Sequence, residues 1–424
     1  MLSRGIIMKT ITTGVFNDSF PPQIDGVANV AVNYARIINE RYGRAVVAAP
    51  QYPGADDNYS FEVLRYPSTY LGKNIGYRAG NPFDLRLLKQ LEKSRLDIIH
   101  SHSPFSSAVL ARILRSVTDV PVVFTYHTKF DVDFARSLPA GPMRKASTRF
   151  ILNNIKACDE VWVVSEGAGE NLRSIGYGGD YYVMKNGVDF ERGRSENSRV
   201  EVLRKQHGIP KKTPVFLFVG RMMWYKGIKL SLDGLCAARA EGQDFRFVLV
   251  GEGHDLPEIK KYAVSAGLAD RCIFAGAVED RELLRDYFSM SRMFLFPSTF
   301  DTNGIVVREA AACGVPSVTI KDSCAAEEIE HKVTGLLIDN EVCSMKEAVM
   351  FGCKNKAAPR RMGQNASARL YYSWDDAVAA AFARYLVIIE EYRHKEDASK
   401  NGRSLGVKYG MSEHRKGGER EKHR

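Results

Sequence analysis

Short apolar runs alternate along the whole chain with segments long enough to form helices. Each run has the length of a buried strand. Strands that alternate with helices in this way predict parallel sheets, and two successive series of them predict an α/β protein with two doubly wound, Rossmann-like domains. The first series comprises Thr10–Phe16, Ala45–Ala49, Glu62–Tyr66, Asp97–Ser101, Val122–Tyr126, Glu160–Val164 and Tyr182–Met184; the second comprises Val215–Val219, Phe245–Val250, Cys272–Ala275, Met293–Phe296, Ser317–Ile320 and Gly335–Ile338.

The apolar periodicity lapses in the middle of the chain. After Asn186-Gly187-Val188-Asp189 comes the polar stretch 190–198, whose composition is typical of a hinge. We therefore expect an N-terminal domain over residues 1–190 and a C-terminal domain over residues 191–373.

Two further segments follow the last expected strand. Residues 374–393 carry an amphipathic pattern and predict a helix that crosses back onto the first domain. Residues 394–424 contain Gly and Ser and are expected to form a disordered basic tail. From residue 393 onward there are ten basic and five acidic side chains, which is half of the chain's net charge of +10. The tail is either a solvated segment without a role or one attracted to an anionic membrane surface.

The run Met293–Phe296 leads into a second feature, a turn that opens a helix. Pro297 ends the strand, and Asn303-Gly304-Ile305 falls where the helix begins. The free backbone N–H groups and the positive dipole end of such a helix form a site for phosphate.

Two acids accompany this helix start. Glu309 lies about two turns into the helix, and helical side chains lean toward the N-terminus, so its carboxylate can reach back toward a bound ligand. Asp301 lies at the mouth of the turn. The pair suits an anionic ligand that also carries hydroxyl groups; the alternative is an ordinary buried helix with two solvated acids.

Two cations follow the first strand of the second domain. Arg221 and Lys226 are five residues apart beyond the strand end, so a planar guanidinium and a point charge can bind one diphosphate. The alternative is a pair of ordinary surface cations.

In the first domain, Gly26 opens a helix after the first strand, and its missing side chain would let a diphosphate approach the backbone. A plain turn glycine is the alternative. His127 follows Val122–Tyr126, and His100 and His102 end the strand before it. These are carboxyl ends of strands, where open α/β sheets bind ligands, although a single histidine is commonly structural.

Composition narrows the possibilities further. At 424 residues the chain is too long for one ordinary core, and no apolar run is long enough to span a membrane. The start is too short for a secretory signal, so we expect a cytoplasmic protein. Its seven scattered cysteines suggest neither disulfides nor zinc, and no metal is expected. No aromatic stacking motif supports nucleic-acid binding, so no nucleic-acid partner is expected.

Several of these features stand in a fixed order: Gly220-Arg221, Lys226-Gly227, Gly251-Glu252-Gly253, Asp301, Glu309-Ala310 and Cys313-Gly314-Val315-Pro316. The ordered set resembles the retaining glycosyltransferases of family 4 (group 1), whose two-domain fold is called GT-B. The resemblance covers nearly the whole chain up to about residue 392. Residues 20–28 and Thr125-Tyr126-His127-Thr128 are similar to bacterial enzymes that glycosylate diacylglycerol or phosphatidylinositol.

The resemblance implies a role for each matching position. It implies that the N-terminal domain, residues 1–190, binds the acceptor and that the C-terminal domain, residues 191–373, binds the nucleotide sugar. It also implies that Arg221 and Lys226 hold the donor diphosphate and that Glu309 bonds the ribose hydroxyls. The turn at Asn303, Gly304 and Ile305 would contact phosphate and sugar, and Gly26 would approach the phosphate from the other domain. His127 would contact the transferred sugar, and Asp301 would contact sugar hydroxyls. Two positions depart from the family pattern: Asp301 is usually Glu, and Asp25-Gly26 replaces a double glycine.

The implied reaction is retaining, metal-independent transfer of a hexose from a nucleotide sugar to a hydroxyl, with no cofactor. UDP-glucose is the favoured donor, with GDP-mannose as the alternative, and diacylglycerol at the inner face of the plasma membrane is the favoured acceptor. The basic and apolar segment 141–156 would then be an interfacial helix, although an ordinary surface helix fits the same pattern. The rival functions are a transferase for a soluble polysaccharide or cell-envelope precursor, a nucleotide-sugar epimerase, and a non-enzymatic binding scaffold that keeps nucleotide affinity without turnover.

Overall fold

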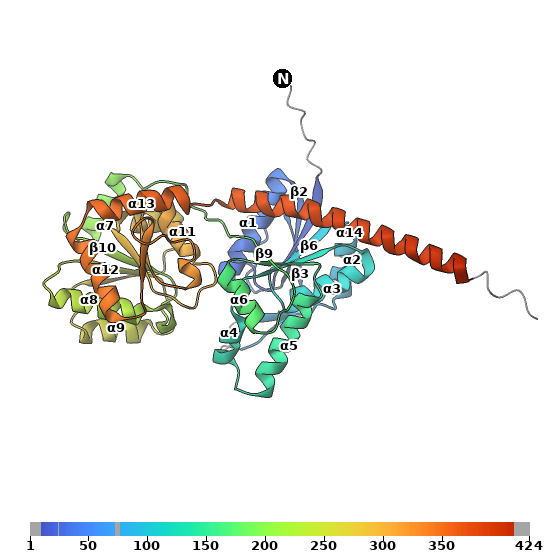
Figure 1. The fold of residues 1–424 in the computed structure, drawn as a ribbon, viewed down its shortest axis with the longest axis horizontal. Helices are drawn as coiled ribbons and strands as arrows, with labels where there is room; N and C mark the ends of the chain where they lie inside the picture. Colours follow the sequence, from blue (N-terminus) through green and yellow to red (C-terminus); the bar gives the residue numbers. More distant parts are fainter. Residues whose placement is uncertain (1–9, 24, 73–76, 411–424) are drawn as a thin grey trace, which may run out of the picture.

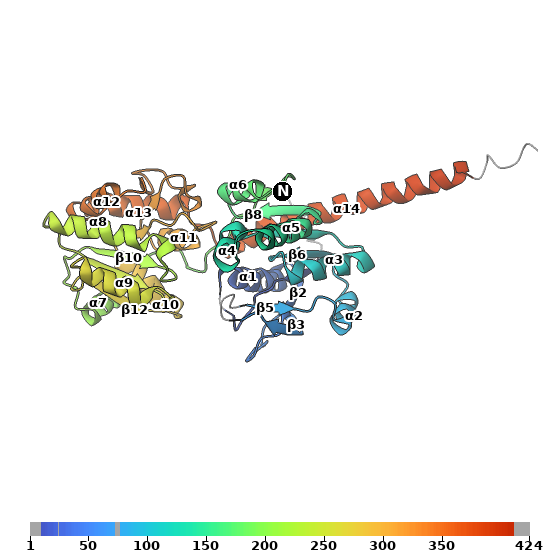
Figure 2. The same cartoon turned by 90° about the horizontal axis from the view of Figure 1, so that it is seen from below.

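The computed structural model describes residues 10–23, 25–72 and 77–410, with only the backbone for 396–410. Two lobes lie side by side, each built on a parallel sheet with helices on both faces (Figure 1). Figure 2 shows α8 and α12 on one face of the second sheet and α9 and α10 on the other. The expected α/β class with two doubly wound domains is confirmed.

The first lobe is organised around a seven-stranded sheet in the order β3-β2-β1-β6-β7-β8-β9, parallel throughout. A small antiparallel hairpin, β4-β5, lies apart from it. The strands are β1 (Ile11–Phe16), β2 (Gly43–Pro50), β3 (Glu62–Tyr66), β4 (Ser68–Tyr70), β5 (Arg78–Gly80), β6 (Ile98–Ser101), β7 (Val122–Tyr126), β8 (Glu160–Val163) and β9 (Tyr182–Val183); the helices are α1 (Gly26–Arg41), α2 (Leu85–Lys93), α3 (Ser106–Thr118), α4 (Phe130–Ser137), α5 (Pro142–Lys156) and α6 (Glu166–Ser174).

The second lobe has a six-stranded parallel sheet in the order β12-β11-β10-β13-β14-β15. Its strands are β10 (Val215–Val219), β11 (Arg246–Val250), β12 (Cys272–Gly276), β13 (Met293–Phe296), β14 (Ser317–Ile320) and β15 (Gly335–Ile338). Its helices are α7 (Asn197–Gln206), η1 (Trp224–Lys226), α8 (Ile228–Ala240), α9 (Leu256–Ser265), α10 (Arg281–Met290), α11 (Ile305–Ala312), η2 (Cys324–Ala326), α12 (Val342–Lys354) and α13 (Ala357–Arg369).

The last helix, α14 (Trp374–Gly410), leaves the second lobe and packs on the first (Figure 1). Val378, Phe382 and Tyr385 are buried in the core that α1 forms with the first sheet. The crossover helix is therefore present, but its expected end at residue 393 is wrong. Residues 394–410 are helical and not a disordered tail, while 411–424 lie outside the described residues.

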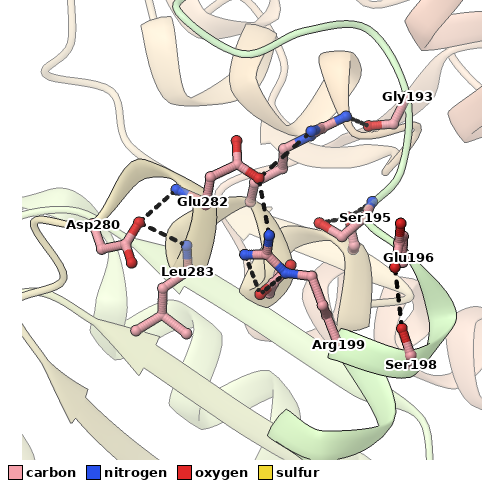
Figure 3. A network of polar contacts seen from close by, with 11 residues as sticks. Gly193, Ser195, Glu196, Ser198, Arg199, Asp280, Glu282 and Leu283 are labelled. Atoms are coloured by element: carbon pink, nitrogen blue, oxygen red, sulfur yellow. Dashed lines mark hydrogen bonds and ion pairs between the residues drawn. The ribbon is translucent and has the colours of Figure 1, made fainter.

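The polar stretch expected to act as a hinge is docked on the second lobe. Figure 3 shows Gly193, Ser195 and Arg199 against α10. Arg285 donates to the Gly193 carbonyl at 3.2 Å, the Ser195 N–H donates to Ser289 Oγ at 2.9 Å, and Arg199 pairs with Asp286 at 2.9 Å. These contacts fix residues 193–199 to one domain, so a hinge over 190–198 is wrong for that part.

The chain passes between the lobes at two short segments that touch each other. The Val188 N–H donates to the Tyr372 carbonyl at 3.0 Å. Gly187 packs so closely on the return segment that a Cβ there would lie 2.4 Å from Trp374 Cα. Position 187 therefore requires glycine, because the two connecting segments cross there in close contact.

Candidate functional site

Lys226 and Asp301 meet where two neighbouring strands of the second sheet end. Lys226 lies in η1 after β10, and Asp301 follows β13, the strand beside β10. Lys226 Nζ forms an ion pair with Asp301 Oδ1, and its side chain is only 9% exposed. Asp301 Oδ2 is buried without a hydrogen-bond partner in the part of the chain that the structure describes. The site thus holds a desolvated cation and a carboxylate oxygen ready to accept a hydrogen bond.

Arg221 lies on the same strand end and faces the first domain. Its side chain is exposed, and its charge lowers the pKa of Asp133 in α4. Burial has the larger effect on Asp133 and raises its pKa overall, while Arg221, Arg136 and Lys226 all oppose that rise. Two cations of the second domain therefore act on one carboxylate of the first.

Helix α4 covers this cation cluster. Lys129 Nζ, at the N-cap of α4, donates to the Thr299 carbonyl at 3.4 Å, and Arg136 Cζ lies 3.6 Å from the centroid of the Tyr225 ring. Residues 129, 133 and 136 share one helix face, so Asp133 lies between two contacts with the second domain. The sequence interpretation missed Asp133 and Arg136, because their partners belong to the other domain.

Glu309 lies in a different set of contacts. It is buried in α11, and its Oε1 accepts a hydrogen bond from Arg281 Nη2 at 2.6 Å. Burial raises the pKa of Glu309, and Arg281 partly offsets the rise. Arg281 also lies 3.5 Å from Asp189, in the segment between the domains. The described contacts of Glu309 therefore run to Arg281 and not to the pair formed by Lys226 and Asp301, and its ribose role stays a prediction.

Arg281 was missed by the sequence interpretation. It opens α10, just beyond the carboxyl end of β12, a position that is itself a signal in a doubly wound sheet. A ribose bound at Glu309 would share the carboxylate with this guanidinium.

The turn at Asn303-Gly304-Ile305 is in contact with the first domain. Gly304 has φ 61° and ψ 47°, and a Cβ there would lie 3.0 Å from Ala325 Cβ, so glycine is required. Asn303 Nδ2 donates to the Val164 carbonyl at 2.6 Å, while Asn303 Oδ1 is buried without a partner among the described residues. Ile305 is the first residue of α11. Phosphate binding at this turn stays a prediction.

His127 lies at the interface of the two domains. Its carbonyl accepts a hydrogen bond from Thr302 Oγ1 at 2.5 Å, and its Nε2 lies 3.1 Å from His102 Nδ1. Burial lowers the pKa of His127 to about 3, so its imidazole is neutral near pH 7. His127 therefore lies beside the loop that carries Asp301. This position is compatible with the prediction that both residues contact the transferred sugar.

Gly26 is the exposed first residue of α1. A Cβ there would meet no described atom within 4 Å, so its backbone is open to a ligand. The preceding Asp25 caps the helix, with Oδ1 accepting from the Val27 and Ala28 N–H groups at 2.9 and 2.7 Å. Tyr77 donates to the other oxygen at 3.2 Å. A carboxylate therefore already occupies the anion-binding end of α1.

A cavity of about 460 Å³ lies between the lobes; Asn303 and Gly304 line it together with the starts of α6 and α11 and with η2. Its cations Lys185 and Arg308 both pair with Glu328. Glu327 accepts hydrogen bonds from the Glu166 and Gly167 N–H groups at the start of α6, at 3.0 and 2.7 Å. The charged groups of this cavity thus have partners within the protein, as Lys226 has in Asp301.

Within the described ranges, no three His, Cys, Asp or Glu side chains gather closely enough to hold a metal ion. Nor does any helix there combine the length and apolar character that crossing a membrane requires.

Comparison with known proteins adds family information. Residues 24–192 match the family model described as Glycosyltransferase Family 4, and residues 199–369 match the model described as Glycosyl transferases group 1. An alpha-monoglucosyldiacylglycerol synthase of Streptococcus pneumoniae is 25% identical over 77% of this chain and 75% of its own length. A GDP-mannose-dependent alpha-mannosyltransferase of Corynebacterium glutamicum is 27% identical over 81% of this chain and 80% of its own.

Solved structures share the fold at lower identity. A sucrose-phosphate synthase from Thermosynechococcus elongatus superposes with a TM-score of 0.72 at 19% identity, over 90% of this chain and all of that one. The Anabaena protein HepE, solved with UDP and glucose, gives a TM-score of 0.69 at 18% identity, over 89% of this chain and all of that one.

Proposed function

This chain belongs to the glycosyltransferases of group 1 and family 4, with the GT-B fold, and from that premise we propose that it glycosylates a membrane lipid. The proposed reaction moves a hexose from a nucleotide sugar, UDP-glucose in the first place, to a hydroxyl of diacylglycerol. The configuration of the anomeric carbon is retained. The observation that carries the proposal is the buried pair of Lys226 and Asp301 beside Arg221, facing the first domain.

In the proposed mechanism, the cations stabilise the leaving group. Arg221 and Lys226 offset the charge that grows on the diphosphate as the bond from the anomeric carbon to the phosphate oxygen breaks. The acceptor oxygen bonds to the same face of that carbon, and its proton passes to the departing phosphate oxygen. Asp301 accepts a hydrogen bond from a sugar hydroxyl at Oδ2. Side chains supply the positive charge, so the proposed reaction needs neither metal nor cofactor.

Support for a lipid acceptor comes from the name of the pneumococcal relative and from helix α5. Met143 and Phe150 are 55% and 46% exposed, and Lys145, Arg149 and Lys156 are exposed too. Basic and apolar side chains that are exposed together suit an anionic bilayer. We accordingly propose that the enzyme works as a peripheral protein at the cytoplasmic face of the membrane.

Arg144 does not belong to that exposed face. Its guanidinium donates to the carbonyls of Ala135 and Leu138 at 2.7 and 2.9 Å, where it satisfies the C-terminal end of α4. Arg144 is therefore left out of the proposed membrane face of α5, which consists of Met143, Lys145, Arg149, Phe150 and Lys156.

The test is incubation of the full chain with a panel of nucleotide sugars and diacylglycerol vesicles, followed by mass spectrometry of the lipids. A hexosyl-diacylglycerol made from UDP-glucose supports the proposal. Transfer to water-soluble acceptors alone would point to the polysaccharide alternative. An altered donor sugar in the absence of any acceptor would identify an epimerase.

A further inference from the structure

Three histidines of the first sheet lie together behind the proposed sugar site. His100 and His102 stand at the end of β6, and His127 follows β7, the next strand of the sheet. The ring centroids of His100 and His102 are 3.9 Å apart, and those of His102 and His127 are 5.3 Å apart. All three side chains are buried, and burial lowers the pKa of each below its usual range. All three are therefore neutral near pH 7, and each carries one ring proton.

His100 does not take part in the hydrogen bond to His127. Its Nδ1 is 2.5 Å from Tyr385 Oη, and its Nε2 is 2.6 Å from Thr125 Oγ1. Hydroxyls can donate or accept, so both nitrogens of His100 are satisfied in either tautomer. The proton that matters to His127 is shared with His102 alone.

The contact between His102 and His127 allows two arrangements of protons. In one, His102 Nδ1–H donates to His127 Nε2. In the other, His127 Nε2–H donates to His102 Nδ1, and the single ring proton of His102 then lies on Nε2, since Nδ1 must be bare to accept. These tautomers have opposite consequences for the free nitrogen of His127.

The buried Nε2 of His102 decides between them. This atom is sealed from solvent and has no hydrogen-bond partner in the described part of the chain. Its surroundings are aromatic, with the Tyr34 ring 5.2 Å and the His100 ring 3.9 Å away between centroids. A proton on Nε2 would make a buried N–H donor without an acceptor, which costs free energy, whereas a proton on Nδ1 has His127 Nε2 as its acceptor.

We propose that His102 is a positioning residue that donates from Nδ1 to His127 Nε2 and so holds His127 as the tautomer protonated at Nδ1. This inference rests on the proposed sugar transfer for its functional meaning. His127 Nδ1 makes no hydrogen bond to a described residue, and unlike His102 Nε2 it is not completely shielded from solvent. It is the nitrogen left for a ligand, and in this tautomer it offers an N–H donor.

The consequence concerns what His127 can do to a sugar. An Nδ1–H group can donate a hydrogen bond to a hydroxyl or to the ring oxygen of the transferred hexose. It cannot act as the base that removes the proton from the attacking hydroxyl of the acceptor substrate. That limit agrees with a reaction in which the departing phosphate oxygen takes this proton. His127 thus orients the sugar, and His102 acts only through His127.

The first arm of the test reads the tautomer without reference to activity. The full chain is prepared with ¹⁵N-labelled histidine rings, and the His127 signals are identified by their loss in His127→Gln. We expect a protonated Nδ1 and a bare Nε2 in the unaltered protein. His102→Phe keeps a flat ring but removes the donor, so the His127 tautomer should shift or become mixed. His102→Asn keeps an N–H close to the position of Nδ1 and should preserve it.

The second arm measures donor kinetics in the same variants. His102→Phe should lower kcat about tenfold or more with a donor KM within about threefold, while His102→Asn stays within about threefold of the parent in both. Tyr385→Phe is the matched control, because it removes a buried hydroxyl bonded to His100 and leaves His102 and His127 untouched. It should change neither the tautomer nor kcat.

A proton on His127 Nε2 in the unaltered protein would overturn the proposal, as would a His102→Phe variant with unchanged tautomer or unchanged kcat. Equal losses in His102→Phe and Tyr385→Phe would also count against it, because they would indicate a packing effect. If no nucleotide sugar is turned over, the proposed function fails, and the ring signals still decide whether His102 sets the tautomer.

Discussion

At the scale of single residues, the proposed chemistry depends on charges that are desolvated. Lys226 is almost fully buried against Asp301, with the rings of Tyr225 and Phe300 within 5.7 and 5.6 Å of Nζ. A cation in such surroundings interacts with a developing negative charge more strongly than it would in water.

Replacing Lys226 by alanine should therefore lower kcat by about 10²-fold or more, since preorganised charge is lost at the leaving group. Steady-state transfer assays with saturating donor measure this. Lys229→Ala is the matched control, because Lys229 lies three residues on, is exposed, and pairs with Asp233. Comparable activity in the two variants would remove Lys226 from the proposed mechanism.

A second residue-scale prediction concerns Arg281 and Glu309. Arg281→Ala should leave the Glu309 carboxylate buried without its cation and lower the free energy of unfolding by about 1–3 kcal/mol. Urea unfolding measures the loss. Adding Glu309→Gln to that variant should recover part of it, because the buried charge is then absent. If the double variant is no more stable than Arg281→Ala, the two side chains are not coupled.

At the scale of elements, the apolar periodicity located the strands of both parallel sheets, but it missed two short strands and the end of the last helix. It missed β4 and β5, whose residues Ser68–Tyr70 and Arg78–Gly80 form a partly exposed hairpin without an apolar run. It ended the last helix too early, because the apolar face stops where α14 leaves the first domain. Periodicity reports the packing of an element and not the helix itself.

The prediction at this scale concerns the membrane face of α5. Reversing Lys145, Arg149 and Lys156 to glutamate should remove most binding to anionic vesicles, because each basic side chain near such a surface contributes about 1 kcal/mol. Sedimentation with vesicles measures bound protein. Reversal of Lys260 and Lys261 in α9 of the second domain changes two charges elsewhere and serves as the control. Equal losses in both variants would mean a general charge effect.

At the scale of the whole molecule, buried histidines should make the first domain sensitive to acid. The folded-state pKa values of His100, His102 and His127 lie below the unfolded value of 6.5, that of His127 at about 3. The unfolded chain therefore binds more protons below pH 6.5, and stability is lost as the pH falls through that range. Asp18, Asp133 and Glu309 act in the opposite direction, because burial raises their pKa values, that of Asp18 from 3.8 to about 6. We expect the three histidines, which are mostly protonated in the unfolded chain below pH 6, to outweigh these acids.

We accordingly expect the free energy of unfolding to fall as the pH is lowered from about 6 to about 5. Urea unfolding followed by the fluorescence of Trp162, which packs on His100, measures it. His102→Asn should make the slope shallower by about one proton. A slope that does not change in this variant would contradict the assignment of buried neutral histidines.

The sequence by itself determined the two parallel sheets, the crossover helix and the strand ends at which Arg221, Lys226, Asp301 and His127 lie. These follow from short-range causes, namely apolar periodicity, turn residues and helix starts, which neighbouring residues carry. The family motifs belong to the same level, since their order along the chain is enough to show them.

Only the tertiary structure decided which side chains meet. It paired Lys226 with Asp301 and Glu309 with Arg281, placed α4 over the cations, and set His102 against His127. It also docked residues 193–199 on α10 and so removed most of the expected hinge. The physical reason is that these contacts join residues far apart in the chain, and their geometry depends on how strands and whole domains are placed, which no local pattern encodes.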